Sequence, residues 1–335
     1  MIKEAILKLS NKEDLSKEMA YEVMNEIMSG NASGVQIGSY LTALSMKGET
    51  IDEIVSSAKS MRSHATKILN DKDVLEIVGT GGDKSNSFNI STTSAIVLAA
   101  CGIPIAKHGN RASSSKCGAA DVLEALGVKI DILPEKSMEM LDNIGICFLY
   151  APLYHSAMKN VAPVRRELGI RTIFNILGPL SNPLGASMQL MGVYEENLVE
   201  PLAEVLANLG VKRGMVAYGT ERLDEISICA KTKVCEIRDG WFKSYEINPL
   251  DYGFKLYDKN ELLGGDATQN AKITRNILNG EKGAKRDAVL INSAAALYIS
   301  RDDLTFEAAI KEVEDAIDKG KAAKKLEEFI KFSNS

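Results

Sequence analysis

The chain has 335 residues, of which 45% are hydrophobic and 25% charged, and its formal net charge is −5. This is enough apolar material for one large or two ordinary domains, and the negative charge argues against a nucleic-acid-binding protein or a basic membrane-binding surface. Five cysteines without a CxxC pair and only three histidines argue against a disulfide framework and a zinc site. The N-terminus does not resemble a signal peptide, and the longest apolar run, near residues 95–101, is too short for a membrane helix. We therefore expect a soluble, cytoplasmic protein.

The first 72 residues carry a helical pattern. Apolar side chains such as Leu9 and Val23 belong to a series that recurs at helical spacing, and no strand pattern interrupts it. Ser33 and Thr50 are typical helix-start residues. The sequence predicts an all-helical N-terminal domain over residues 1–72.

From residue 73 onward, strand patterns and helix patterns alternate. Strands are predicted at 74–78, 103–106, 128–132, 146–149, 189–193 and 214–218, and helices at 92–101, 119–126, 135–143 and 198–209. This alternation predicts an α/β domain with a mainly parallel, buried central sheet and helices on both faces.

The remaining segments complete the predicted organisation. Two short apolar runs at 226–230 and 234–237 predict a hairpin, and helices follow at 267–278, 288–300 and 306–319. Residues 162–180 break the α/β alternation and are typical of a helix, a turn and a second helix. We expect residues from about 162 to 185 to complete the helical domain, so that 73–161 and 186–335 form the α/β domain.

A glycine-rich turn, Gly79-Thr-Gly-Gly-Asp83, follows the first predicted strand. Glycines let the backbone approach a ligand closely, and successive amides in such a turn form an anion site. Ser91 and Thr92 lie just beyond, where they are expected to cap a helix whose N-terminus also favours phosphate. The turn lacks the Gly-Lys-Ser/Thr ending of a Walker A motif. It indicates a phosphate site, with an ordinary tight turn as the alternative.

Two further groups of polar residues carry chemistry. The stretch Lys107-His-Gly-Asn-Arg-Ala-Ser-Ser-Ser115 combines two cations with small hydrogen-bonding side chains, a mixture that suits a phosphorylated ligand. The acidic pair Asp224-Glu225 offers oxygen ligands of the kind that Mg²⁺ prefers. A solvent-exposed polar loop and an ordinary acidic turn are the alternatives for these two segments.

Together these segments resemble the anthranilate phosphoribosyltransferase family over residues 5 to about 320. The resemblance is carried by residues 79–83 (GTGGD), 89–92 (NIST), 107–111 (KHGNR), 118–127 (GAADVLEALG), 162–169 (APVRRELG), 171–175 (RTIFN), 178–180 (GPL) and 224–225 (DE). The order and spacing of these motifs make the resemblance specific. It implies a small helical domain and a large α/β domain of the nucleoside phosphorylase/phosphoribosyltransferase type, with the active site in the cleft between them.

The resemblance also implies a reaction. The family transfers the phosphoribosyl group of phosphoribosyl pyrophosphate (PRPP) to the amino group of anthranilate in tryptophan biosynthesis, and it depends on Mg²⁺, with two ions per active site. It further implies a homodimer. The apolar N-terminal helices make the helical domain the expected dimer contact, and the composition predicts no nucleic acid or membrane partner.

The resemblance assigns site residues one by one. PRPP would contact Gly79, Gly82, Asp83, Ser87, Asn89, Ile90, Ser91, Thr92, Lys107, His108, Gly109, Asn110, Arg111, Ala112, Ser113, Ser114, Ser115 and Ala119. Anthranilate would contact Gly79, Asn110 and Arg165, with His108 near it. Mg²⁺ would be held by Ser91, Asp224 and Glu225. Ala119 stands where the family often has a hydroxyl residue, so a side-chain contact to PRPP is lost there.

Three alternatives compete with this interpretation. A pyrimidine nucleoside phosphorylase shares the fold and the glycine-rich loop, but residues 107–111, 162–169 and the acidic pair argue against it. A non-catalytic nucleic-acid-binding relative would carry a basic groove, which the net negative charge disfavours. A purely structural protein leaves the polar, glycine-rich loops unexplained.

Overall fold

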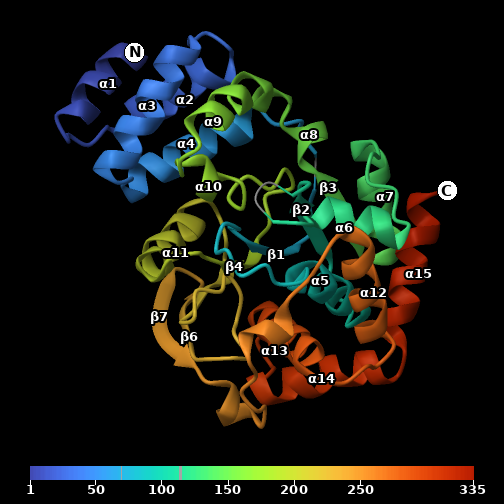
Figure 1. Ribbon diagram of the computed structural model, residues 1–335. Helices are drawn as coiled ribbons and strands as arrows, with labels where there is room; N and C mark the ends of the chain where they lie inside the picture. Colours follow the sequence, from blue (N-terminus) through green and yellow to red (C-terminus); the bar gives the residue numbers. More distant parts are fainter. Residues whose placement is uncertain (69, 113–114) are drawn as a thin grey trace.

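The computed structural model describes residues 1–68, 70–112 and 115–335. The chain begins with four helices, α1 (Ile2–Ser10), α2 (Lys17–Met28), α3 (Gly34–Lys47) and α4 (Ile51–Ser63). As predicted, the side chains of Ser33 and Thr50 cap α3 and α4 by accepting hydrogen bonds from backbone amides of the first turn. Figure 1 shows these helices grouped at one end of the molecule.

Strands and helices then alternate. They are β1 (Leu75–Gly79), α5 (Ile90–Ala100), β2 (Ile105–Gly109), α6 (Ala119–Leu126), α7 (Pro134–Ile144), β3 (Ile146–Tyr150), α8 (Ala151–Tyr154), η1 (Ser156–Asn160), α9 (Ala162–Leu168), α10 (Phe174–Leu177), β4 (Met188–Gly192), η2 (Glu196–Leu198), α11 (Val199–Asn208) and β5 (Arg213–Gly219). The chain ends with β6 (Thr232–Arg238), β7 (Trp241–Ile247), η3 (Pro249–Tyr252), η4 (Lys259–Leu262), α12 (Ala267–Leu278), α13 (Ala284–Ser300), α14 (Phe306–Asp318) and α15 (Lys321–Ser333).

The strands form one sheet in the order β3-β2-β1-β4-β5-β6-β7. The first five strands of this order pair in parallel, and β6 and β7 add an antiparallel hairpin at one edge. The predicted mainly parallel sheet is therefore confirmed.

The sheet separates two hydrophobic cores. Along β5, Met215 and Ala217 contribute to the core shared with α5, α13 and α15, whereas Val216 and Tyr218 contribute to the other. This second core joins α1–α4 to α11 and to apolar residues of segment 161–180, including Ile173 and Phe174. Figure 1 shows α9 and α10 beside α3 and α4 in agreement with this grouping.

Three predicted strands differ from the structure. Residues 128–132 alternate buried and exposed side chains as a strand would, but they pair with no strand among the described residues, and the Lys129 amide donates to Ser333 Oγ at 3.0 Å. Residues 226–230 form turns around Ser227, whose hydroxyl accepts from the amides of Cys229 and Ala230. The hairpin is made by β6 and β7 instead.

The third difference concerns residues 103–109, which include two of the predicted PRPP-binding residues. The predicted strand at 103–106 lies at Ile105–Gly109, so that Lys107 and His108 belong to β2 and not to a loop after it. Both side chains are buried. Their burial gives them fixed surroundings that an exposed loop would not provide.

Candidate functional site

The site is built around the carboxyl ends of β1 and β4, where the loop after β5 crosses them. A Cβ atom on Gly79 would lie 2.3 Å from Asp224 Oδ2, and one on Gly192 would lie 1.6 Å from the Asp224 carbonyl oxygen. Only glycine allows the Asp224 backbone to approach the strand ends so closely. The two glycines that end β1 and β4 therefore position the acidic pair.

The acidic pair is buried next to the glycine-rich turn. Asp224 Oδ2 accepts a hydrogen bond from the Gly81 amide at 2.6 Å, and the Asp224 amide points to Asp83 Oδ2 at 3.4 Å. Burial raises the pKa of Asp224 to about 7, and the neighbouring Asp83 carboxylate raises it further. Burial and the Asp224 charge likewise raise the pKa of Glu225. Crowded carboxylates of this kind are stabilised by a bound cation.

The N-terminus of α5 faces this pair. Asn89 precedes the helix as its N-cap residue, so Ser91 and Thr92 lie inside the first turn and the prediction that they cap the helix was wrong. Asn89 Nδ2 instead donates to the Cys117 carbonyl oxygen at 3.2 Å, and the Ser91 backbone amide lowers the pKa of the Glu225 carboxyl against the effect of burial. The first turn contains no acidic residue, so the helix dipole remains available to an anion.

Lys107 brings a positive charge into the same region. Its Nζ atom donates to the Ile77 carbonyl oxygen at 2.7 Å and lies 3.4 Å from Ser91 Oγ. Burial lowers the pKa of Lys107, and the carboxylates of Glu76 and Glu225 oppose that effect. A cation beside a helix N-terminus and a glycine turn is suited to a phosphate group. We call Lys107, the first turn of α5 and residues 79–83 the phosphate cradle.

His108 and His155 form a pair of buried rings whose centroids are 5.1 Å apart. Burial lowers the pKa of His108 to about 3 and that of His155 to about 4. The Nε2 atoms of both rings are buried and have no hydrogen-bond partner among the described residues. Both imidazoles are therefore neutral near pH 7 and suited to orienting a ligand.

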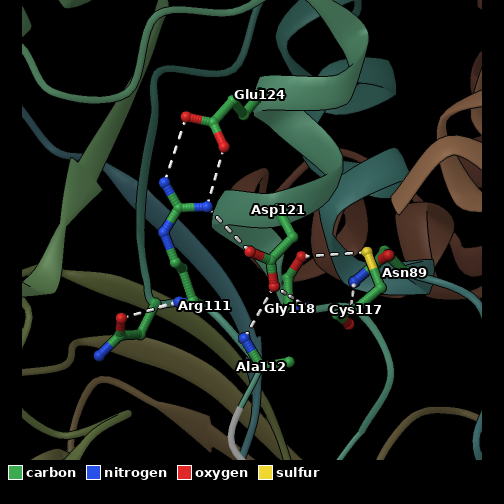
Figure 2. A network of polar contacts seen from close by, with 8 residues as sticks. Asn89, Arg111, Ala112, Cys117, Gly118, Asp121 and Glu124 are labelled. Atoms are coloured by element: carbon green, nitrogen blue, oxygen red, sulfur yellow. Dashed lines mark hydrogen bonds and ion pairs between the residues drawn. The ribbon is translucent and has the colours of Figure 1, made fainter. Parts of the chain in front are cut away.

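The segment after β2 is fastened to α6 by a network of polar contacts (Figure 2). Arg111 forms ion pairs with Asp121 at 3.0 Å and with Glu124 at 2.8 Å. Asp121 Oδ2 also accepts from the amides of Ala112 and Gly118, at 2.8 and 2.9 Å. We call these five residues the α6 clasp. The clasp ties residues 111–112, which directly follow Asn110, to the start of α6.

Arg165 lies on α9, with its guanidinium carbon 5.3 Å from the centre of the Phe174 ring. It forms no ion pair among the described residues, although it is half-buried. Burial lowers the pKa of Arg165. An unpaired, half-buried guanidinium is suited to a ligand carboxylate.

The contacts above link many of the predicted site residues, but not all of them. Gly79, Ser91, Lys107, Asp224 and Glu225 meet at one end of the sheet. Ser87 bridges to Leu263, Gly109 ends β2, and Ala119 begins α6. In the described part of the chain, Arg165 forms no hydrogen bond or ion pair with the phosphate cradle, and Ser113 and Ser114 lie outside the described residues.

Sequence reasoning missed Arg171 as a site residue. Its guanidinium donates to the Gly82 carbonyl oxygen and to Glu195 Oε1, and it lies 4.0 Å from the centre of the Tyr194 ring. The Arg171 carbonyl oxygen in turn accepts from Ser45 Oγ of α3 at 3.1 Å. Arg171 thus connects the glycine-rich turn to the helical region, and its place in the RTIFN motif was the available signal.

Comparisons with known proteins agree with this geometry. The helical bundle domain of a glycosyl transferase family matches residues 3–65, and the a/b domain of that family matches residues 71–323. The chain is 61% identical to the anthranilate phosphoribosyltransferase of Methanobrevibacter smithii, with 100% of both chains covered.

Solved structures show the same likeness. The enzyme of this name from Thermus thermophilus superposes with a TM-score of 0.93 at 40% identity, covering 99% of each chain. The Saccharomyces cerevisiae enzyme, in complex with PRPP and Mg, superposes with a TM-score of 0.92 at 28% identity, covering 99% of this chain and 98% of that chain. The yeast enzyme has also been solved with 4-fluoroanthranilate. This chain belongs to the anthranilate phosphoribosyltransferase family.

Proposed function

We propose that this protein transfers the phosphoribosyl group of PRPP to the amino group of anthranilate, giving N-(5-phosphoribosyl)anthranilate and pyrophosphate. The observation that carries the proposal is the convergence of Lys107, the N-terminus of α5 and the glycine-rich turn beside a buried acidic pair. A diphosphate ester and a divalent cation are the ligands that this combination suits. Full-length identity to an enzyme of this name supports the choice of substrates.

The acidic pair fits Mg²⁺. Asp224 and Glu225 are buried oxygen donors whose repulsion a cation would relieve, and Ser91 adjoins them. The described residues contain no group of three or more acidic, histidine or cysteine side chains that could hold a metal alone. We therefore propose that diphosphate oxygens complete the coordination, with two ions per site. Bound Mg²⁺ would neutralise charge on the leaving pyrophosphate.

The remaining site residues have roles in the transfer of the phosphoribosyl group. The anomeric C–O bond breaks, its electron pair leaves with pyrophosphate, and positive charge develops on the ribosyl group. The lone pair of the anthranilate nitrogen forms the new bond to the anomeric carbon, and the nitrogen then releases one proton to solvent. Lys107, the Gly82 amide and the first turn of α5 stabilise the leaving charge, which is the largest expected contribution to catalysis. The aromatic amine is neutral near pH 7, so it requires positioning more than a strong base. Arg165 pairs with the anthranilate carboxylate, and Asn110 and the neutral His108 lie at the same substrate.

One assay tests the proposal. The protein is mixed with PRPP, Mg²⁺ and anthranilate, and the loss of anthranilate fluorescence is followed with each component omitted in turn. Turnover that requires all three components is the expected result, and absence of turnover in the complete mixture would refute the proposed reaction.

A double variant tests the metal site. Asp224→Asn with Glu225→Gln removes both negative charges, so we expect the Mg²⁺ concentration for half-maximal activity to rise by about tenfold or more. An unchanged Mg²⁺ titration would show that the acidic pair does not bind the metal.

We also propose a domain division and an assembly. Residues 1–72 and about 162–185 form the helical domain, and 73–161 with 186–335 form the PRPP-binding domain. Two copies join through the helical domains, and the enzyme acts in the cytoplasm. Among the described residues, no helix has the length and apolar character needed to cross a membrane.

A further inference from the structure

Beyond one pair of residues, the described strands β1 and β2 do not pair with each other, which leaves a gap in the sheet at the end that carries the site. We call this gap the split between β1 and β2. The register between these strands consists of the single pair Leu75↔Ile105 among the described residues. By contrast, β1 and β4 pair over five positions, and so do β2 and β3. Backbone groups of β1 and β2 beyond Leu75 therefore need partners other than each other.

Buried side chains provide those partners. Glu76 Oε1 accepts from the His108 amide at 3.1 Å, and Lys107 Nζ donates to the Ile77 carbonyl oxygen at 2.7 Å. Asn182 Nδ2 donates to the Ala106 carbonyl oxygen at 2.9 Å. A glutamate, a lysine and an asparagine thus replace the missing ladder hydrogen bonds.

Glu76 is the centre of this arrangement. Its side chain is fully buried, and its second oxygen, Oε2, accepts from Asn182 Nδ2 at 2.9 Å. Burial raises the pKa of Glu76, while Asn182, Lys107, the His108 amide and Arg62 act in the opposite direction. The charges of the buried Lys107 and the half-buried Arg62 therefore both act on this carboxylate.

The same network reaches the helical region. Arg62 of α4 donates to the Leu180 carbonyl oxygen at 2.7 Å, and Gln189 of β4 donates to the Pro179 carbonyl oxygen at 2.9 Å. Asn182 lies in this short connection between α10 and β4. Glu76 and Asn182 thus join the strand that carries Lys107 to a connection that is also held from α4.

A merely structural role explains this arrangement poorly. Burying a carboxylate carries a large desolvation penalty, and apolar side chains of similar volume stabilise a core at least as well. Ordinary backbone pairing between β1 and β2 would also avoid the charge. The split instead lets the Glu76 carboxylate lie near Lys107, the cation of the phosphate cradle, and compensate its charge.

We propose that Glu76 is a positioning residue for phosphoribosyl transfer, which holds Lys107 and the His108 backbone in place by filling the split between β1 and β2 together with Asn182. The inference rests on the proposed function. Glu76 has no contact with the reacting atoms in this role, since it acts through Lys107 and His108.

The test is the kinetics of Glu76→Gln. This change keeps the side-chain volume but removes the charge, and it places an amide NH₂ opposite either the His108 amide or Asn182 Nδ2, both of which are donors. We expect kcat/KM for PRPP to fall by about tenfold or more. PRPP affinity, measured by calorimetry with Mg²⁺ present, should weaken in parallel.

Glu236→Gln is the matched control. Glu236 is also a buried sheet carboxylate, and it accepts from Arg238, Tyr245 and Tyr298 in β6, β7 and α13, apart from the cradle. This variant should lose stability yet keep wild-type kcat and KM at a temperature at which it is folded. If Glu76→Gln behaved in the same way, with lower stability but unchanged kinetics, the positioning role would be refuted.

Asn182→Ala provides a second test if Glu76→Gln does not fold. It removes one donor to Glu76 and leaves the bond from the His108 amide, so a smaller fall in kcat/KM for PRPP is expected. Unchanged kinetics in this variant would also overturn the proposal. An inactive wild-type protein would refute the proposed function itself, which separates the two failures.

Discussion

Arg165 and Arg166 are adjacent on α9 but differ in their surroundings. Arg165 is half-buried against Phe174, whereas Arg166 is exposed. Because a charge-assisted pair with the anthranilate carboxylate is lost, Arg165→Ala should raise the KM for anthranilate about 10- to 100-fold and that for PRPP less than about twofold. Arg166→Ala is the matched control and should leave both constants near wild type. Steady-state kinetics with each substrate varied would measure this, and equal effects of the two variants would contradict the assignment.

His155 predicts a pH dependence of stability. Burial lowers its pKa in the folded protein to about 4, below the value of about 6.5 in an unfolded chain. The unfolded chain therefore binds the extra proton first, so the stabilisation is fully present above about pH 6.5 and is lost as the pH falls toward 4. Urea unfolding should show that His155→Gln loses about 2 kcal/mol less than wild type between about pH 7 and pH 4.5. Identical losses in the two proteins would show that His155 does not contribute.

At the scale of elements, the α6 clasp predicts that a substitution in α6 changes the KM for PRPP through the segment after β2. Burial raises the pKa of Asp121, but the amides of Gly118 and Ala112 and the Arg111 guanidinium outweigh it and keep that pKa low. Asp121→Asn replaces an acceptor by a donor at these amides, so the segment after β2 should loosen and the KM for PRPP should rise several-fold. Glu124→Gln disturbs only the exposed part of the clasp and should change the KM less than about twofold. Equal kinetics in wild type and Asp121→Asn would show that the clasp does not order the binding segment.

The elements differ in how well the sequence predicts them. Helices α3 and α4 have caps and periodicity within one short segment, so local rules place them correctly. Segment 128–132 has the same alternation as a strand, and only the absence of a neighbouring strand distinguishes it. Strand β7 is mostly exposed and therefore lacks the alternation that would have revealed it.

The candidate site shows the same contrast between local patterns, which the sequence reveals, and long-range strand pairing, which it does not reveal. The glycine turn, the Lys107 segment and the acidic pair are visible as local clusters, and the structure brings their members together. The role of Glu76 depends on the split between β1 and β2, which is a property of the sheet and not of any single segment. Long-range register of this kind is not encoded in a local pattern.

For the whole molecule, the proposed dimer predicts the effect of surface changes on α3. Val35 and Met46 have exposed fractions of 80% and 81%, which are high for apolar side chains. Because a charge would be buried unpaired in a helical-domain interface, Val35→Glu with Met46→Glu should convert a dimer into monomers. Light scattering coupled to size exclusion would measure the mass. A monomeric wild-type protein, or a double variant that stays dimeric, would contradict the proposed assembly.

The final helix, α15, packs against α5 and contributes Phe329 and Leu326 to the core on that side of the sheet. Its end is also tied to the turn after α6, where Asn334 Nδ2 donates to the Gly127 carbonyl oxygen at 2.9 Å. Residues outside the proposed site thus support α5, the helix whose first turn belongs to the proposed diphosphate site. Shortening the protein by these last two turns would leave every substrate-binding side chain present and still impair catalysis, so an engineered truncation or fusion should preserve α15 intact.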